Sequence, residues 1–519
     1  MKKIFFVLLF LLPIFAIFSA SPPENIDYAQ INPEKYPDAD SVLILLRQHI
    51  RYNPDATAET RYESVEKILT EKGRQENRTI SMHFNEHYNR IEVIKLELER
   101  AGQIIPIDVE SNSRVMTESG QMSSNIYDPN QRVLKISIPD LQPGDVIRSV
   151  YRDITLKSRI KGVWTEFSLL QFQVPALYAE IAVDAPPELP LKNLMIKDEI
   201  KGTIQYHKEQ RDGRTWHIWS ARNVPQFFSE PSMPPWYMSA QRLLLSTAAD
   251  WEEISRWYWD LCAPRMAKIT PAMKTKTAEL IDGKSGDREK IEAIFQFVAK
   301  DIRYSGITVE KEAPGYEPHD VNLTFENRYG VCRDKAALLV ALLREAGYNA
   351  FPVLFYSGPR KDVEVPNNYF NHAISAVELT KGEYLLMDST NETTPEIFPS
   401  YLSNMSYLVA RPEGDTLRTS AVVPATQNEL KITTRGALDV SGKLNAETEI
   451  VFNGINDDVY RGAFSSWMPE RVRQFVTQQL GQAVAGAVVE SIELEPADLR
   501  DMSKKLKLKI RFSAKNFLI

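Results

Sequence analysis

The alternation of apolar and polar residues predicts a β domain in the first half of the chain. Between residues 79 and 247, short runs such as RIEVIKLELE and RVLKISIPDL alternate the two kinds of side chain and are separated by turn signals such as Pro143-Gly144. A period of two places alternate side chains on opposite faces of a strand, and many such short strands are typical of two packed sheets. With the preceding runs at 38–51 and 58–73, residues 38–247 are therefore expected to form an all-β sandwich.

A helical period replaces the alternation after Asp250. The segments 251–262, 272–282 and 287–304 carry apolar residues three or four positions apart, and the last of them begins at an acidic residue, Asp287. This spacing gathers apolar side chains on one face of a helix, and acidic residues favour the first helical turn. Three helices are therefore predicted in this region.

A fourth helix and an antiparallel hairpin complete the central region. The stretch CRDKAALLVALLREAG predicts a buried helix from Cys332 to Ala346, with Gly347 as its stop. Strand patterns follow at three places: 350–356, 371–379 and 383–388. Helices followed by an antiparallel hairpin are typical of an α+β domain, which we place at residues 248–412.

Strand alternation returns in the last hundred residues. It is clear from about Leu430 in KITTRGALDVSGKLNAETEIVF, and one helix is predicted over residues 469–482. Residues 428–519 are therefore expected to form a C-terminal β-rich domain, which makes the whole chain multidomain. The final residues, LKLKIRFSAKNFLI, still alternate, and this leaves open whether the last domain is complete.

The first twenty residues are typical of an export signal. Two lysines precede an apolar run from Ile4 to Phe18, small residues follow it, and cleavage is expected after Ala20. The run is shorter than the roughly 18 to 20 apolar residues that cross a bilayer, and Pro13 interrupts it. We therefore expect residues 1–20 to be a signal peptide, and the mature chain to be secreted or periplasmic without a stable membrane span.

Composition and charge narrow the range of partners. The formal net charge is −7 and there is no basic block, which argues against nucleic acid as the partner. With 43% hydrophobic and 25% charged residues, the composition is that of an ordinary globular protein with a large core. Two cysteines, Cys262 and Cys332, cannot form a disulfide framework, although they could form one bridge. The oligomeric state stays open.

Two short motifs match metal or phosphate sites but stand in the wrong context. The stretch His83-Phe84-Asn85-Glu86-His87 fits an H-x-x-E-H zinc motif, which needs a helix, whereas its flanks alternate as strands do. Gly283-Lys284-Ser285 copies the end of a phosphate-binding loop, but Ala278 replaces the first glycine and a helix precedes it. Both stretches are expected to be turns, so no metal and no cofactor is predicted.

Cys332 occupies a position that favours a nucleophilic thiolate. It lies in the first turn of the predicted helix, just after Gly330, where unpaired N–H groups and the positive end of the helix dipole stabilise negative charge. The same N–H groups could bind the oxyanion of a tetrahedral intermediate, and the buried remainder of the helix would hold the sulfur rigidly. We therefore predict Cys332 as a nucleophile, with a disulfide to Cys262 as the alternative.

A histidine and an aspartate in the predicted hairpin could complete a catalytic triad. His372 is expected at the start of one strand and Asp388 at the end of the next. If residues 380–382 form the turn, Ile374 faces Asp388, and His372 is a diagonal neighbour on the same face, roughly 7 to 8 Å away at the backbone. A thiolate nucleophile needs a base, and the base needs an orienting partner. We assign these roles to His372 and Asp388, although either residue alone is usually an ordinary surface residue.

These residues resemble the core of the transglutaminase-like superfamily. Its pattern runs G-x-C-x-D, then N-H, then a strand ending D-x-T, which here are Gly330 to Asp334, Asn371-His372 and Asp388 to Thr390. The stretches IPDLQPGDVIRSVYRD, LLQFQVPALYAEIAVDAP and LLLSTAADWEEISRWY are similar to secreted bacterial members in which a β-sandwich domain of unknown function precedes the core. The resemblance spans approximately residues 40–410 and implies a papain-like α+β core.

The resemblance implies thiol-dependent acyl transfer or hydrolysis at protein or peptide amides. Cys332 would attack the carbonyl, His372 would move the proton, and Asp388 would orient the imidazole, giving a thioester that water or an amine resolves. The superfamily includes cross-linkers, peptidases, deamidases and inactive members, so the fold does not fix the reaction. The alternative function is a non-catalytic binding or assembly module, and no side chain can be named as a second oxyanion donor.

Overall fold

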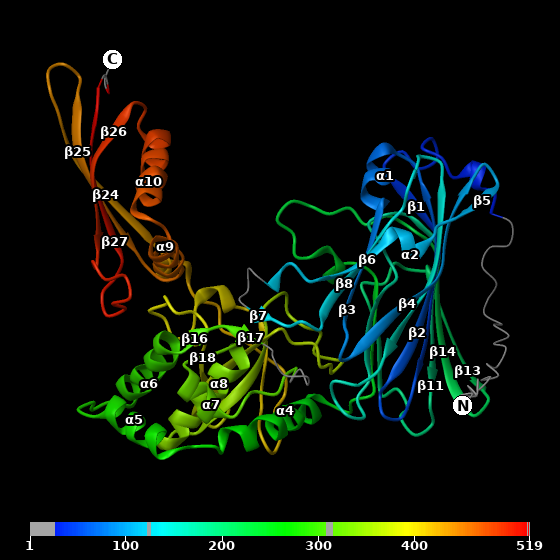
Figure 1. The fold of residues 1–519 in the computed structure, drawn as a ribbon, viewed down its shortest axis with the longest axis horizontal. Coiled ribbons are helices and arrows are strands. Elements are labelled where there is room, and N and C mark those ends of the chain that lie inside the picture. The colour runs from blue at the N-terminus through cyan, green and yellow to red at the C-terminus, as the bar shows by residue number, and fades with distance from the viewer. Residues whose placement is uncertain (1–25, 122–125, 308–314, 516, 518–519) are drawn as a thin grey trace, which may run out of the picture.

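The structure, a computed structural model, describes residues 26–121, 126–307, 315–515 and 517. The expected signal peptide, residues 1–20, lies outside the described residues. Among the helices within these ranges, none is both long and apolar enough to cross a membrane. Figure 1 shows a large β domain, a helix-rich core beside it and a smaller C-terminal unit beyond the core. The predicted order of a β domain, an α+β core and a β-rich C-terminal domain is confirmed.

An eight-stranded sheet forms the main layer of the N-terminal domain. Its neighbouring strands are antiparallel except for β1 and β11, which are parallel. The two runs at the start of this domain, which have no clear period in the sequence, are central strands, β1 and β2. In spatial order the sheet contains β13 (Ile204–Arg211), β14 (Arg214–Val224), β11 (Ala176–Ala185), β1 (Ser41–Tyr52), β2 (Ala58–Ile68), β9 (Val146–Thr155), β4 (Asn89–Arg100) and β5 (Gln103–Pro106).

Two small sheets form the second layer, so the predicted sandwich has a divided layer. Leu243 and Leu245 of the first small sheet pack on the β1–β11–β14 part of the large sheet, and Ile136 of the second packs on its β4–β9 part. Figure 1 shows β3, β6 and β8 on the side of the large sheet that faces the core. The first small sheet contains, in spatial order, β10 (Thr165–Leu169), β15 (Arg242–Ser246) and β12 (Asn193–Lys197). The second contains β3 (Thr79–Asn85), β8 (Gln131–Ser137) and β6 (Ser113–Thr117).

Short elements complete the N-terminal domain. Two helices, α1 (Glu71–Asn77) and α2 (Val109–Asn112), lie in its connections, as does a 3-10 turn, η2 (Trp236–Met238). The strand β7 (Ile126–Tyr127) pairs in parallel with β17 (Gly306–Ile307) of the core. The N-terminal domain and the core are therefore joined by backbone hydrogen bonds as well as by the chain connection.

The core packs five helices against one five-stranded antiparallel sheet. All four helices predicted in the core from the sequence are present, and α7 is an addition. The helices are α4 (Trp251–Met266), α5 (Pro271–Ile281), α6 (Asp287–Asp301), α7 (Val321–Asn327) and α8 (Cys332–Glu345). The sheet order is β21 (Glu383–Met387), β20 (His372–Thr380), β19 (Ala350–Tyr356), β22 (Ser406–Val409) and β23 (Arg418–Thr419). A two-residue pair, β16 (Arg303–Tyr304) with β18 (Tyr329–Gly330), lies beside them.

Helix α8 lies at the centre of the core. Ten consecutive residues, Asp334–Leu343, are buried, because the helix contacts β19 and β20 on one side and α4, α5, α6 and α7 on the others. A helix that is apolar nearly all the way round is expected in such a position. Close packing on every side fixes the start of α8, and therefore the position of Cys332.

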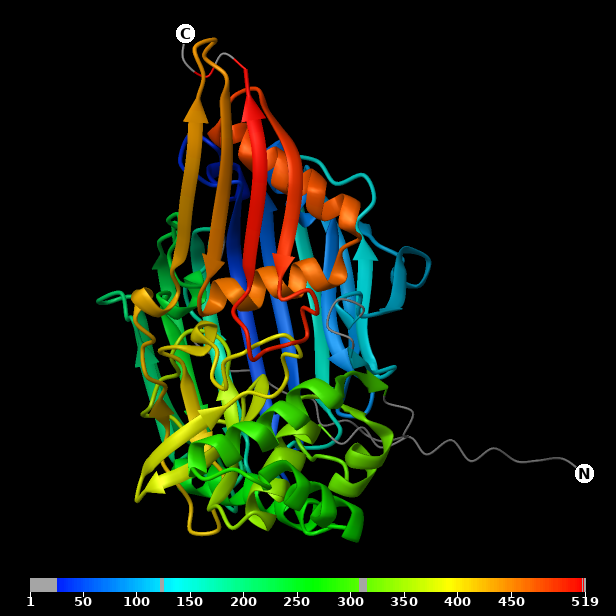
Figure 2. The same ribbon diagram turned by 90° about the vertical axis from the view of Figure 1, so that its left-hand side faces the viewer.

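The C-terminal domain is a four-stranded antiparallel sheet with two helices on one face. The predicted helix is α10 (Pro469–Ala483), and α9 (Ile455–Ser466) precedes it without having been predicted. Figure 2 shows the four strands side by side, with both helices crossing behind them. Buried Arg461 pairs with Asp457 of the same helix at 2.6 Å, and it ties α9 to the connection before β27 by donating to the carbonyl of Lys504 at 2.8 Å. The strands, in order, are β24 (Leu430–Leu438), β25 (Leu444–Phe452), β27 (Lys507–Ala514) and β26 (Ala487–Glu495).

Candidate active site

Cys332 is the first residue of α8, as the sequence predicts. The preceding residue, Val331, is extended and serves as the N-cap. The side chain of Cys332 is half-buried, and the nearby backbone N–H of Ala373, at the start of β20, helps to lower the pKa of its thiol. The helix N-terminus and this N–H group both favour a negative charge on sulfur.

A buried aspartate organises the turn that leads into α8. One carboxylate oxygen of Asp334 accepts the N–H of Val331 at 3.0 Å, and the other accepts the backbone N–H and the ring Nδ1 of His319 at 2.9 and 3.0 Å. Burial would raise the pKa of Asp334, but the hydrogen bonds from His319 and the charge of Arg333 lower it below its ordinary value. The carboxylate therefore stays charged where it holds the nucleophile's turn.

Gly330 makes this arrangement sterically possible. A Cβ added at Gly330 would lie 2.7 Å from the Cβ of Asp334 and 3.2 Å from the Cγ2 of Thr324, which is closer than carbon atoms pack. The spacing G-x-C-x-D thus has a physical reason. The glycine lets the chain pass close to the aspartate that caps the helix bearing the cysteine.

Gly330→Ala is therefore expected to destabilise the core by about 1 to 3 kcal/mol through overpacking. Thermal unfolding of the purified variant measures the change. Gly481→Ala, in α10, is the matched control, because a Cβ added there meets nothing within 4 Å. Replacing a glycine inside a helix by alanine should leave the stability of the protein unchanged or slightly higher. Equal unfolding temperatures for Gly330→Ala and wild type would contradict the close approach.

The hairpin places His372 beside Asp388 in the predicted register. Ser375 pairs with Met387 and Ala376 with Leu386, so that continuing the ladder sets Ile374 opposite Asp388; a bulge at Leu379 alters only the turn end. The Nε2 of His372 lies 2.9 Å from an Oδ atom of Asp388. That bond leaves Nδ1 available to Cys332, which helps to raise the pKa of the ring.

The three side chains stabilise one another's charged forms. For His372, burial would lower the pKa, but the charge and hydrogen bond of Asp388, together with Cys332, raise it to about 10. For Cys332, burial would raise the pKa, but the hydrogen bond and charge of His372 lower it below the ordinary thiol value. Both shifts favour the thiolate–imidazolium form of the pair over the neutral form.

Hydrogen bonds from Thr390 fix the orientation of Asp388. It is 1% exposed, and its second oxygen accepts the hydroxyl and the backbone N–H of Thr390 at 2.6 and 3.0 Å. Burial would raise its pKa, but His372 and Thr390 lower it. The D-x-T pattern thus supplies both the carboxylate and the group that fixes its orientation.

Two family models match this chain. Residues 274–389 match the transglutaminase-like superfamily, and residues 54–228 match a domain of unknown function, DUF3857. Residues 274–389 are therefore a transglutaminase-like core. This core contains Cys332, His372 and Asp388, and the DUF3857 domain covers most strands of the large sheet. No curated protein matches the chain.

One solved structure shares the overall fold of this chain. A crystal structure from Parabacteroides distasonis, provisionally described as a protease, covers 92% of this chain and 93% of its own at 12% identity, with a TM-score of 0.57. At that identity the likeness shows the fold alone. A structure from Cytophaga hutchinsonii, provisionally described as a cysteine protease, covers 60% of this chain and 79% of its own at 13% identity, with a TM-score of 0.19, which carries no argument.

Sequence reasoning missed Tyr304 in the transglutaminase-like core. Burial, together with the charge of the neighbouring Cys332 sulfur, raises the pKa of its phenol. Its backbone N–H donates to Glu392 at 2.8 Å. No local pattern marks this tyrosine, because the pairing of β16 with β18 brings it to the cysteine from 28 residues upstream.

Lys335 is a second residue that the sequence reasoning passed over. It is fully buried in α8 and donates to the carbonyls of Ala299 and Ile302 at 3.1 and 2.6 Å. Burial lowers its pKa to about 8. A lysine on an otherwise apolar helix is a signal that could have been noted. Lys335 ties the start of α8 to the end of α6, whose C-cap residue, Ile302, lies two residues before Tyr304.

The second cysteine, Cys262, has a different environment from the first. Cys262 is fully buried in α4, its thiol contacts the hydroxyl of Tyr258, and burial raises its pKa well above the ordinary thiol value. Both cysteines are free thiols, so the alternative of a disulfide between them is not what the structure has.

Residues 283–285 connect α5 with α6, as expected. The stretch 83–87 is a turn only in its last two residues, because residues 83–85 still belong to strand β3, where His83 lies 2.5 Å from Glu118. Within the described ranges, no group of three histidine, cysteine or acidic side chains is arranged to hold a metal ion.

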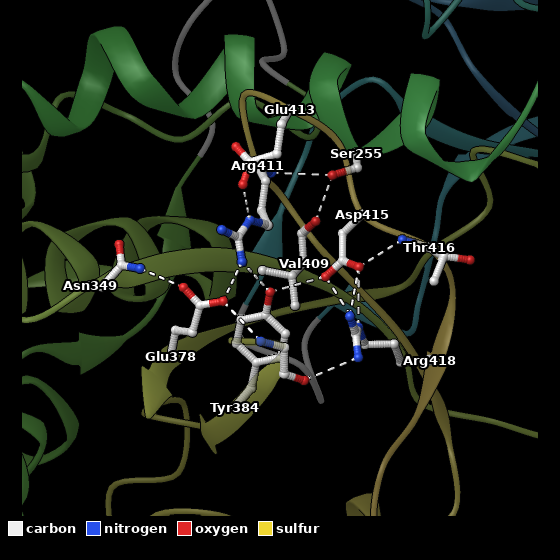
Figure 3. A network of polar contacts seen from close by, with 11 residues as sticks. Ser255, Asn349, Glu378, Tyr384, Val409, Arg411, Glu413, Asp415, Thr416 and Arg418 are labelled. Atoms are coloured by element: carbon white, nitrogen blue, oxygen red, sulfur yellow. Dashed lines mark hydrogen bonds and ion pairs between the residues drawn. The ribbon is translucent and has the colours of Figure 1, made fainter. Parts of the chain in front are cut away.

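The far end of the hairpin is fixed by a polar network, shown in Figure 3. Arg411 binds Glu378 of β20 at 2.7 Å and the hydroxyl of Tyr384 of β21 at 2.5 Å. That hydroxyl also contacts Asp415 at 3.2 Å, and Asp415 binds Arg418 at 2.9 Å. Because these pairs are partly buried, they hold β20 and β21 together at the end opposite to His372 and Asp388.

The loop after Asp388 is held from two sides. Within it, Glu392 binds the backbone N–H of Tyr304, and Asn391 donates to Asp458 of α9 at 2.6 Å. Asp458 is 5% exposed, and burial raises its pKa, although the hydrogen bond from Asn391 opposes this. The C-terminal domain thus contacts the support of the candidate site.

Proposed function

We propose that this protein is an exported cysteine enzyme that transfers or hydrolyses acyl groups at protein or peptide amides. The observation that carries the proposal is that Cys332 and His372 favour each other's charged forms while His372 is bonded to buried Asp388 at 2.9 Å. Cysteine acyl-transfer enzymes use such a thiolate, base and orienting group. A non-catalytic module would have no need of a thiol and an imidazole that favour each other's charged forms.

In the proposed reaction the Cys332 thiolate attacks the amide carbonyl carbon. The carbon–nitrogen bond breaks, and His372 gives its proton to the leaving nitrogen, which departs as ammonia or an amine. Water or another amine then attacks the thioester and passes a proton to His372, while the thiolate leaves. The N–H groups at the start of α8 can bind the oxyanion, and Tyr304, whose phenol neighbours the sulfur, is the side chain that can supply a second donor.

The proposal of export rests on residues 1–20. Two lysines, an apolar run and small residues before Ser21 support a cleaved signal peptide and a secreted or periplasmic mature chain. Intact-mass measurement of the chain from the extracytoplasmic fraction tests it. A chain found there with Met1 still present would contradict cleavage.

Alkylation tests the nucleophile directly. Because the pKa of Cys332 is lowered and that of Cys262 is raised, iodoacetamide should modify Cys332 well below pH 8 and leave Cys262 largely unmodified. Mass mapping of peptides from the unreduced protein, labelled between pH 5 and 9, gives both rates. Equal, slow labelling of the two thiols, or a bridged Cys262–Cys332 peptide, would rule out an activated nucleophile.

A further inference from the structure

A separate cavity lies between the N-terminal domain and the core. Its volume is about 600 Å³, within the range of pockets that hold small ligands, and domain interfaces are a common place for such pockets. One wall comes from β10, η2 and β15, and the other from the loop between β19 and β20. The described lining residues do not include the triad. They do include an aromatic and apolar group: Phe167, Trp236, Tyr237, Leu244, Tyr356 and Tyr369.

One cation, Lys361, projects among the aromatic rings of this cavity. Its Nζ lies 4.6 Å from the ring centre of Tyr356, 4.9 Å from that of Phe370 and 5.6 Å from that of Tyr369. Among the described residues it donates one hydrogen bond, to the carbonyl of Tyr369 at 2.5 Å. Burial lowers its pKa to about 7, although the charge of Asp362 opposes this. The ammonium is therefore short of compensating negative charge.

The carboxylates of the cavity wall do not supply that charge. Asp362 lies 3.2 Å from Arg242 and 3.3 Å from Lys197, so two other cations already balance it. Glu166 accepts hydrogen bonds from Gln48 and Ser168, at 3.1 and 2.6 Å, and burial raises its pKa. Neither acid is hydrogen-bonded to the ammonium of Lys361.

A second donor lines the same loop. The side-chain oxygen of Asn368 accepts the hydroxyl of Thr165 at 3.2 Å, which fixes the amide across the domain interface. Its Nδ2 makes no hydrogen bond among the described residues, yet Asn368 lines the cavity. Beside its aromatic and apolar side chains, and with Asp362 and Glu166 already engaged elsewhere, the wall thus presents an ammonium and an amide N–H to the cavity.

We propose that this cavity binds an aromatic carboxylate, with its ring between the aromatic side chains and its carboxylate on Lys361 and Asn368. A free aromatic acid and the C-terminal aromatic residue of a peptide share this chemistry. The site is distinct from the proposed triad. It shares with it only the loop that runs from the cavity wall into His372.

Isothermal titration calorimetry at pH 6 tests the proposal on the full mature chain. Cys332→Ser is used as the background, so that binding is measured whether or not the chain is an enzyme. N-acetyl-phenylalanine should bind at least about tenfold more tightly than N-acetyl-phenylalaninamide, which has the same ring without the charge. Ala-Ala-Phe with a free carboxylate distinguishes the sources: tighter binding than the small acid identifies a peptide end, and weaker binding identifies a free acid. No binding of either acid, or equal affinity for acid and amide, would overturn the proposal.

Variants locate the site. Lys361→Met should weaken binding of the acid about tenfold or more and leave the amide nearly unchanged, because it removes the charge while keeping a chain of similar length. Lys381→Met, at an exposed turn, is the matched control and should bind both like the parent. Tyr369→Ala, at a position that is 66% exposed, should fold and weaken both ligands by removing ring contacts. Unchanged acid binding by Lys361→Met or by Tyr369→Ala would place the ligand elsewhere and overturn the assignment.

Discussion

Cys332→Ser is expected to reduce turnover of amide substrates by a factor of about 10⁴ or more. A serine hydroxyl has a far higher pKa than a thiol, so the charged pair with His372 does not form and the attacking anion is missing. Turnover is measured on peptide substrates at pH 7 by two readouts, cleavage and incorporation of a labelled amine into glutamine side chains. These readouts also separate hydrolysis from transfer.

Cys262→Ser is the control for this loss. That thiol is buried in α4, and the replacement should leave turnover within a few-fold of wild type. Retention of wild-type turnover by Cys332→Ser would remove Cys332 from the reaction. If the wild-type chain turned over no amide in either assay, the function left would be that of a binding or assembly module.

His372→Ala is expected to lower turnover by about 10³-fold or more and to change the pH at which Cys332 is alkylated. Without the imidazolium, burial is left to raise the pKa of the thiol, so rapid labelling should appear only at or above the ordinary thiol pKa. Wild type should label well below pH 8, and the difference is read from the pH profile of the alkylation rate.

Asp388→Asn refines this experiment. The imidazole remains but loses the carboxylate that raises its pKa to about 10, so part of the labelling at low pH should survive. The expected order of labelling rates at pH 6 is wild type, then Asp388→Asn, then His372→Ala. A His372→Ala variant that labels as fast as wild type would show that the helix terminus alone activates the sulfur.

Local periodicity was sufficient to predict most elements around the candidate site. The helix that begins at Cys332 and the hairpin of β20 and β21 have strong periods of 3.6 and 2, and the turn length fixed the register near Asp388. Chemical knowledge of triads then selected three residues from the two elements. These predictions needed no long-range information beyond a single strand pair.

The features that could not be predicted from the sequence depend on contacts between distant segments. Tyr304 reaches Cys332 through a two-residue strand pair, which is too short to give a pattern. Helix α9 buries Asp457 and Arg461 as an ion pair, so its inner face does not appear apolar in the sequence. The parallel pairing of β1 with β11 joins strands more than a hundred residues apart, and alternation within each strand cannot specify that partner.

The loop after Asp388 limits how modular this protein can be. Asn391 binds Asp458 of the C-terminal domain, Glu392 binds the backbone of Tyr304, and Thr390 binds Asp388 itself. Three consecutive residues thus contact three different parts of the protein: the C-terminal domain, Tyr304 and the triad. A core excised at residue 412 would keep all three triad residues but lose the contact between Asp458 and Asn391 that helps to hold the loop after Asp388. Recombination or engineering that exchanges C-terminal domains must therefore preserve a partner for Asn391. The segment that has to be transferred intact is larger than the core.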